Sequence, residues 1–122
     1  MSKRIEMLPL TPVQIGVFEK YARVEITLDD LSRALGGRFE LSLDPEDTWI
    51  NELYRIPRPG ITVTREHVEN ALSKWRTHQV GEDDMVRWAS VLLISEVYEF
   101  DPKNPDFVGD VLADIKYRDF PL

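Results

Sequence analysis

The chain contains one phrase twice: VFEKYARVEITLDDLSRAL at residues 17–35 aligns without a gap on ALSKWRTHQVGEDDMVRWA at residues 71–89. The matched positions pair Lys20 with Lys74, Tyr21 with Trp75, Ile26 with Val80, Asp29 and Asp30 with Asp83 and Asp84, Leu31 with Met85, and Arg33 with Arg87. Each copy has a helix end with a lysine and an aromatic residue, a short turn with one aliphatic residue, and a second helix that begins with acids. This pattern predicts an antiparallel helical hairpin in each half of the chain.

Helix-capping residues set the expected limits of the two hairpins, about 11–36 and 64–95. Thr11, Thr27 and Thr64 each precede an apolar helical pattern. The first two are followed, three positions later, by a glutamine or an aspartate that completes a capping box. The first hairpin ends at two consecutive glycines, which adopt the left-handed conformation that terminates a helix. Acids at the helix starts and bases at the helix ends also suit the helix dipole.

The rest of the chain predicts a small β element and a fifth helix. Residues 38–63 hold an alternating apolar pattern, turn residues and a Pro-Gly breaker, so we expect a β-like insertion there. Whether residues 44–56 form a strand or a helical turn stays open. Asn104 supplies a cap before Pro105, and residues 105–118 continue with an amphipathic pattern, which predicts a C-terminal helix. The expected fold is mainly α, with five helices, two pseudo-repeated helical hairpins and one β element, in a single domain over residues 1–122.

Composition narrows the classes of function. The chain has no cysteine, which excludes thiolate nucleophiles and cysteine-ligated metals. Its net charge of −7, from 22 acids and 15 bases, disfavours broad attraction to nucleic acid or to an anionic membrane and favours basic partners. No apolar run approaches the roughly 20 residues of a membrane-spanning helix. We therefore expect a cytoplasmic protein that does not bind a membrane.

The sequence contains no catalytic, cofactor or metal motif. The two histidines, His67 and His78, would lie about 16 Å apart on one helix, too far to share an ion. The serines lie in neither a Gly-x-Ser-x-Gly nor a Ser-x-x-Lys motif, and no glycine-rich loop opens a helix. We therefore expect no catalytic, cofactor-binding or metal-binding residue, and no cofactor.

Acidic residues and one aromatic residue form the candidate partner-binding surface. Residues 25–52 and 81–114 hold a large excess of acids, and the repeat would bring these two blocks to related positions. The candidate residues are Asp29, Asp30, Glu46, Asp47, Trp49, Glu82, Asp83 and Asp84. Such a surface predicts a non-catalytic module that binds a basic protein, with an affinity that falls as ionic strength rises. Helix capping and solubility explain the same acids equally well.

Other functions and a second kind of partner stay open. A carboxylate-dependent hydrolase or transferase would need acids of both hairpins to meet in a deep pocket, with strongly raised pKa values. A DNA-binding regulatory protein would need basic residues on one face, although the net charge makes a nucleic acid partner the less favoured reading. Its candidate residues are Arg55, Arg58, Arg65, Lys74 and Arg76. Exposed apolar residues near Trp49 and Phe100 would also permit a homodimer.

The second copy and its extension carry a resemblance to known proteins. The stretch HVENALSKWRTHQVGEDDMVRWASVLL, residues 67–93, resembles small uncharacterised bacterial helical proteins encoded among immunity and phage-related genes. Together with the first copy, the resemblance covers about half of the chain and rests on structural residues. It implies a bacterial cytoplasmic protein of the immunity or inhibitor kind, and it supplies no catalytic residues.

Overall fold

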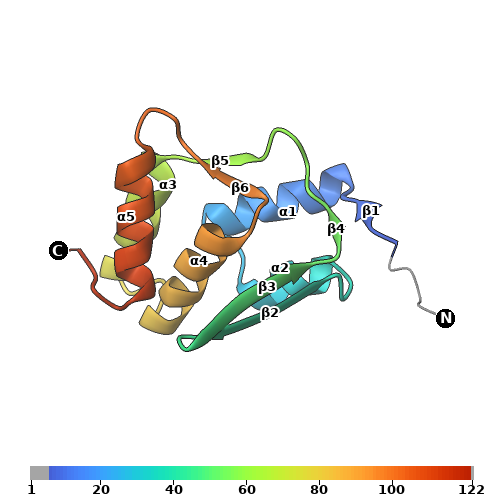
Figure 1. Cartoon of the computed structure of the whole chain (residues 1–122). Helices are drawn as coiled ribbons and strands as arrows, with labels where there is room; N and C mark the ends of the chain where they lie inside the picture. The colour runs from blue at the N-terminus through green and yellow to red at the C-terminus, as the bar shows by residue number, and fades with distance from the viewer. Residues whose placement is uncertain (1–5, 122) are drawn as a thin grey trace.

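The fold mixes helices with small sheets. The computed structural model describes residues 6–121, with 47% of the chain in helices and 19% in strands. The prediction of a mainly α fold with two helical hairpins is therefore wrong. In the described residues the strands form three two-stranded sheets, which lie at separate edges of the helical part (Figure 1). Two of these sheets recruit segments from outside the predicted insertion at residues 38–63.

The helix starts follow the predicted caps. The helices of the described residues are α1 (Pro12–Ala22), α2 (Leu28–Ala34), α3 (Arg65–Arg76), α4 (Glu82–Ile94) and α5 (Pro105–Lys116). The hydroxyls of Thr11, Thr27 and Thr64 each accept a hydrogen bond from the backbone N–H three residues on, and that residue's side chain accepts one in return. Because each box satisfies two N–H groups that would otherwise lack partners, the predicted starts of these three helices are confirmed.

Strand pairing is only partly indicated by the sequence pattern. β2 (Phe39–Asp44) and β3 (Asp47–Glu52) form an antiparallel hairpin, so the segment at residues 44–56 is extended rather than helical. β1 (Leu8–Pro9) pairs in parallel with β4 (Tyr54–Arg55), and β5 (Ile61–Val63) pairs in parallel with β6 (Tyr98–Phe100). Parallel pairing joins segments that are distant in the chain, and strands of two or three residues are too short to show alternation.

The two copies of the sequence repeat have the same structure at the turns after α1 and α3 and differ beyond these turns. Val24 and His78, at equivalent positions after α1 and α3, have φ values of 58° and 61°. In both turns the next residue donates its N–H to the carbonyl of Lys20 or Lys74 at 2.9 Å, the long bond of a Schellman motif. However, α2 has 7 residues and α4 has 13, and α4 packs mainly along α5 rather than α3. Two equivalent hairpins do not form, because α5 covers the apolar face of α4.

The left-handed turn after α3 can be tested by substitution. His78 is exposed, and its φ of 61° strains a residue that has a Cβ by about 1 kcal/mol. We expect His78→Gly to raise the free energy of unfolding by about 0.5 kcal/mol, since glycine relieves the strain but loses more entropy on folding. Urea denaturation measures this change. His78→Ala is the matched control, because it removes the imidazole and keeps the strain; an equal gain in both variants would contradict the prediction.

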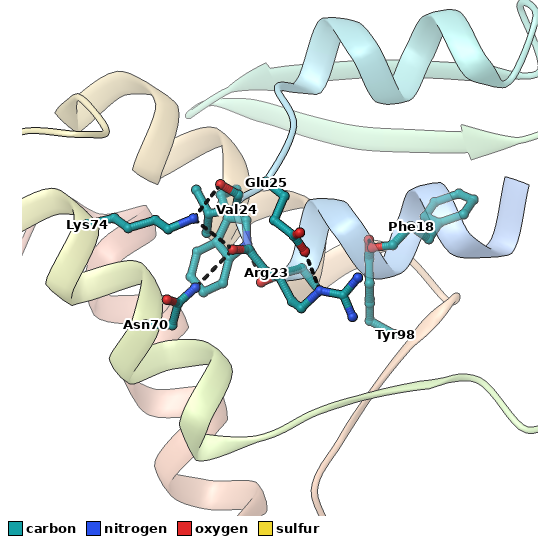
Figure 2. Close-up of polar contacts among 9 residues, drawn as sticks. Phe18, Arg23, Val24, Glu25, Asn70, Lys74 and Tyr98 are labelled. Atoms are coloured by element: carbon teal, nitrogen blue, oxygen red, sulfur yellow. Dashed lines mark hydrogen bonds and ion pairs between the residues drawn. The ribbon is translucent and has the colours of Figure 1, made fainter. Parts of the chain in front are cut away.

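The end of α1 is where other elements converge (Figure 2). Asn70 and Lys74 of α3 donate to the carbonyl of Arg23 at 2.9 and 3.4 Å, and Lys74 Nζ also donates to the carbonyl of Val24 at 3.0 Å. A helix end leaves its last carbonyls without partners inside the helix. Side chains of α3 therefore complete the hydrogen bonding of α1, which joins the two copies of the repeat.

Buried aromatic residues attach α1 to the sheets and to α4. Phe18 is fully buried, and its ring meets the rings of Phe39, Tyr54 and Tyr98 edge-on, with centroids 6.4, 5.7 and 5.9 Å apart. The Tyr98 hydroxyl donates to the carbonyl of Phe18 at 2.7 Å (Figure 2). The Trp88 indole donates to a carbonyl in the last turn of α1 at 3.3 Å. These contacts hold the end of α1, and the turn that follows it, in one position.

Candidate functional site

A pocket of about 220 Å³ lies between the two repeated turns. One side comes from the end of α1, residues 24–27 and the start of α2; the other comes from residues 79–80 and the first half of α4. Three repeat-equivalent pairs line this turn pocket: Glu25 with Gln79, Ile26 with Val80, and Asp30 with Asp84. The duplication therefore places two aspartates, one from each copy, at a single concave site.

The Tyr21 hydroxyl is the unusual group of the turn pocket. Tyr21 lines the pocket and is 3% exposed, and its oxygen has no hydrogen-bond partner within the described residues. Burial is the main cause that raises the pKa of Tyr21; the charge of Asp84 adds to the rise and that of Arg87 opposes it. The hydroxyl is thus a neutral group that lies within the fields of both charges. A buried hydroxyl without a partner costs about 1–3 kcal/mol, so native proteins keep few of them.

The carboxylates of the turn pocket are only weakly paired. Asp30 Oδ2 accepts a hydrogen bond from the backbone N–H of Thr27 at 3.1 Å, the main cause that lowers the pKa of Asp30. Asp84 Oδ1 lies 3.0 Å from Nη1 of Arg87. The Asp30 and Asp84 side chains are 45% and 61% exposed, and ion pairs at such exposure contribute about 1 kcal/mol or less. With Glu25, the lining holds three carboxylates and one guanidinium.

Glu82 and Asp83 pair with a base that sequence reasoning did not connect with them. Arg118, which follows α5, lies 3.2 Å from Glu82 and 2.9 Å from Asp83. The Asp83 hydrogen bond is the main cause that raises the pKa of Arg118. These two candidate residues therefore join the start of α4 to the end of α5. In the sequence, only the basic residues at the end of the last helix pointed to this ion pair, and they do not identify the acids that Arg118 contacts.

The remaining candidate residues lie away from the turn pocket lining. Glu46 occupies the turn of the β2–β3 hairpin, Asp47 and Trp49 lie on β3, and Asp29 lies in the first turn of α2; all four are exposed. Trp49 is 40% exposed on the outer face of the hairpin. Phe100, which was expected like Trp49 to lie among exposed apolar residues, is instead partly buried against the core. The structure thus divides the predicted surface into a pocket, a hairpin tip and a helix-end ion pair.

A larger groove of about 450 Å³ lies beside α3, but several of its polar groups already have partners. Asn70 and Lys74 line the groove and donate to carbonyls at the end of α1 (Figure 2). His67 also lines it, and its Nδ1 accepts from the backbone N–H of Thr64 at 3.0 Å. Burial lowers the pKa of His67. These three side chains of the groove are therefore already used within the protein.

One polar cluster was missed by sequence reasoning. Glu52, on β3, accepts hydrogen bonds from the hydroxyls of Ser95 and Tyr54 and from the backbone N–H of Glu96. Burial raises the pKa of Glu52 against the opposing effect of these hydrogen bonds. Because its oxygens are occupied by groups of the protein itself, the cluster ties β3 to the end of α4. No local pattern marks Glu52, since its partners lie mainly 43 and 44 positions away.

Neither catalysis nor metal binding gains support from this geometry. Within residues 6–121, no three histidine, aspartate or glutamate side chains converge as ligands for a metal ion. The hydrolase alternative requires pocket acids of raised pKa, whereas the pKa of Asp30 is lowered. None of the helices in this part of the chain combines the length and the apolar character that crossing a membrane requires.

In comparisons with known proteins, no family model, no curated protein and no solved structure matched the chain. The resemblance to small bacterial proteins of immunity and phage-related genes is therefore untested.

Proposed function

We propose that the protein is a non-catalytic module that binds a basic protein partner in a bacterial cytoplasm, in the manner of an immunity or inhibitor protein. The observation that carries the proposal is the presence of Asp30 and Asp84 at one pocket whose charged lining is mainly acidic. Since a hydrogen bond lowers the pKa of Asp30, this carboxylate stays ionised near neutral pH. A net charge of −7 also attracts basic surfaces from a distance and raises the rate of encounter.

The β2–β3 hairpin supplies a second contact point. β3 contacts α4, and Glu52 near the end of β3 bonds to Ser95 just after α4. The tip of the hairpin therefore points toward the start of α4, where Asp84 lies (Figure 1). Trp49, exposed on this hairpin beside acidic residues, is the type of side chain that anchors protein interfaces. The proposed contact surface combines this tryptophan with the turn pocket.

The DNA-binding alternative is weakened because four of its five candidate basic residues are engaged within the protein. Arg58 and Arg65 lie 3.9 and 2.8 Å from glutamate oxygens. Lys74 and Arg76 donate to backbone carbonyls. A DNA-binding face would have to give up these contacts before its side chains reached phosphates. No observation favours this function over the binding of a basic protein.

Affinity capture tests the proposal. The immobilised full chain is incubated with a lysate of its source organism at about 50 mM and about 500 mM salt, where screening of exposed charges differs strongly. We expect a protein of positive net charge to be retained at low salt and largely lost at high salt. A variant with Asp29→Asn, Asp30→Asn, Glu46→Gln, Asp47→Asn and Asp84→Asn should retain at least about fivefold less, the effect of losing about 1 kcal/mol of exposed ion pairing.

The matched control neutralises acids that are already paired within the protein. Glu82→Gln combined with Asp83→Asn affects the ion pair with Arg118 and should leave capture nearly unchanged. Purification of the retained protein then allows its affinity to be measured directly as a function of salt. Retention of no protein at low salt, or equal retention by the acidic-surface variant and the native chain, would contradict the proposed function.

A further inference from the structure

The turn pocket has the dimensions of a site for a single side chain. Its volume of about 220 Å³ is below the roughly 300–1,000 Å³ of small-molecule sites and equals the space of roughly seven waters. The aliphatic side chains of Ile26 and Val80 line it together with the carboxylates of Asp30 and Asp84. Such a lining suits a ligand with an apolar stem and a positively charged end.

We propose that the turn pocket receives a lysine side chain of the basic partner, with the ammonium group bound by Asp30, Asp84 and the Tyr21 hydroxyl. This inference rests on the proposed function, because it identifies what part of the partner is recognised. An ammonium group has three N–H donors and no acceptor. The two carboxylates and the phenol oxygen provide one acceptor for each donor, and the methylene stem of lysine contacts the aliphatic residues.

Tyr21 is the observation that separates a binding site from a pair of helix-capping acids. Asp30 also serves in the capping box of α2, so the acids alone do not indicate a ligand. The Tyr21 hydroxyl has no such structural use, since it is buried without a hydrogen-bond partner in the described residues and a phenylalanine would fill the same space. Tyr21 lines the pocket together with Asp84 and Arg87, and the charges of these two residues also act on its pKa.

Arg87 occupies part of the site in the free protein. Its guanidinium pairs with Asp84 at 3.0 Å, and the two side chains are 52% and 61% exposed. A pair this exposed is weak, so an incoming ammonium can take its place while Arg87 turns to solvent. Removal of Arg87 should therefore tighten the binding of lysine. The equivalent base of the first copy, Arg33, does not line the pocket and serves as the matched position.

The test is an NMR titration of the ¹⁵N-labelled full chain with N-acetyl-lysine N-methylamide. The neutral analogue N-acetyl-norleucine N-methylamide has the same apolar stem and lacks the ammonium. We expect the backbone amides of Thr27 and Gln79 and the indole N–H of Trp88, all in pocket-lining residues, to shift with the lysine compound only. The dissociation constant should rise about fivefold in Asp84→Asn and fall about threefold in Arg87→Gln, the size expected for one exposed charge pair.

Two further variants distinguish contact with the ammonium from a general charge effect. Tyr21→Phe should weaken binding about threefold without lowering the thermal midpoint, because the lost hydroxyl has no partner in the free protein. Asp47→Asn and Arg33→Gln, which change the same charges outside the lining, should alter the dissociation constant less than twofold. Equal shifts with both compounds, an unchanged affinity in Tyr21→Phe, or equal effects of Asp47→Asn and Asp84→Asn would overturn the assignment.

The outcomes also separate this inference from the proposed function. If a basic protein is captured in a salt-dependent way but the lysine compound causes no shifts at the turn pocket, the proposed function stands and the lysine site falls. If neither capture nor shifts occur, both fall. Shifts confined to the turn pocket, together with weaker capture by Asp84→Asn than by Asp47→Asn, support both.

Discussion

Glu52→Ala is expected to lower the free energy of unfolding by about 3 kcal/mol. The Glu52 carboxylate accepts hydrogen bonds from two hydroxyls and one backbone N–H. The hydroxyl donors belong to Ser95 and Tyr54, which are 4% and 1% exposed. Alanine leaves both buried groups without their acceptor, and each such group costs about 1–3 kcal/mol. Urea denaturation followed by tryptophan fluorescence gives the change, with the slope of the transition as a check on two-state unfolding.

Two variants test whether the loss comes from these hydrogen bonds. Asn51→Ala removes the exposed neighbour on β3 and should change the free energy of unfolding by no more than about 0.5 kcal/mol. Glu52→Gln should lower the free energy of unfolding by about 1 kcal/mol. The glutamine carbonyl oxygen still accepts from both hydroxyls, but its NH₂ group is a donor and cannot accept from the N–H of Glu96. A Glu52→Ala loss no larger than that of Asn51→Ala would show that the cluster contributes nothing to stability.

The pKa of Glu52 also predicts how the free energy of unfolding depends on pH. Burial raises the pKa of Glu52 above its ordinary value of 4.5, so the folded state binds this proton more readily than the unfolded state. The stability from this group is fully present below pH 4.5 and is lost as pH rises through the raised pKa. Asp30 acts in the opposite sense, because its lowered pKa gives stability that is lost only as pH falls through that pKa. The stability difference between native chain and Glu52→Gln should therefore be larger below pH 4.5 than at about pH 7.

Local chemistry explains which parts of the fold were predictable. Thr11, Thr27 and Thr64 mark helix starts because a capping hydroxyl acts within four residues, and the structure places it there. The pairing of β1 with β4 and of β5 with β6 depends on contacts between segments 46 and 37 positions apart, which no short pattern encodes. The prediction of a mainly α fold failed for that reason: short strands are stabilised by distant partners rather than by their own alternation.

The candidate site, like the fold, was predicted only in part. The repeat indicated that Asp30 and Asp84 occupy related positions, and the structure brings both to the turn pocket. Tyr21 was matched with Trp75 as the aromatic residue at a helix end, which agrees with its buried ring but gives no information about its hydroxyl. The partner of Glu82 and Asp83 was missed, because Arg118 reaches them only after α5 packs along α4. Periodicity identifies a buried face; it does not show which polar atoms lack partners.

Lys74→Met is expected to lower the free energy of unfolding by about 1.5 kcal/mol, because hydrogen bonds from a charged donor contribute about 1.5–3 kcal/mol and this donor is partly exposed. The ammonium donates to the carbonyls of Val24 at 3.0 Å and Arg23 at 3.4 Å (Figure 2). These carbonyls lie at the end of α1, where a positive charge also suits the helix dipole. Methionine keeps the apolar stem of lysine, so the variant removes mainly the charge and its hydrogen bonds.

The repeat itself provides the control for Lys74. Lys20 is the equivalent residue of the first copy, it is exposed, and Lys20→Met changes the net charge by the same amount. We expect this control to alter the free energy of unfolding by no more than about 0.5 kcal/mol. Amide hydrogen exchange locates the effect, since loss of the Lys74 bonds should speed exchange at Val24 and Glu25, whose N–H groups close the turn after α1. Equal losses of stability in the two variants, with no faster exchange at these amides, would contradict the prediction. The effect would then come from the loss of one charge, and the Lys74 hydrogen bonds from α3 to the end of α1 would not stabilise this wall of the turn pocket.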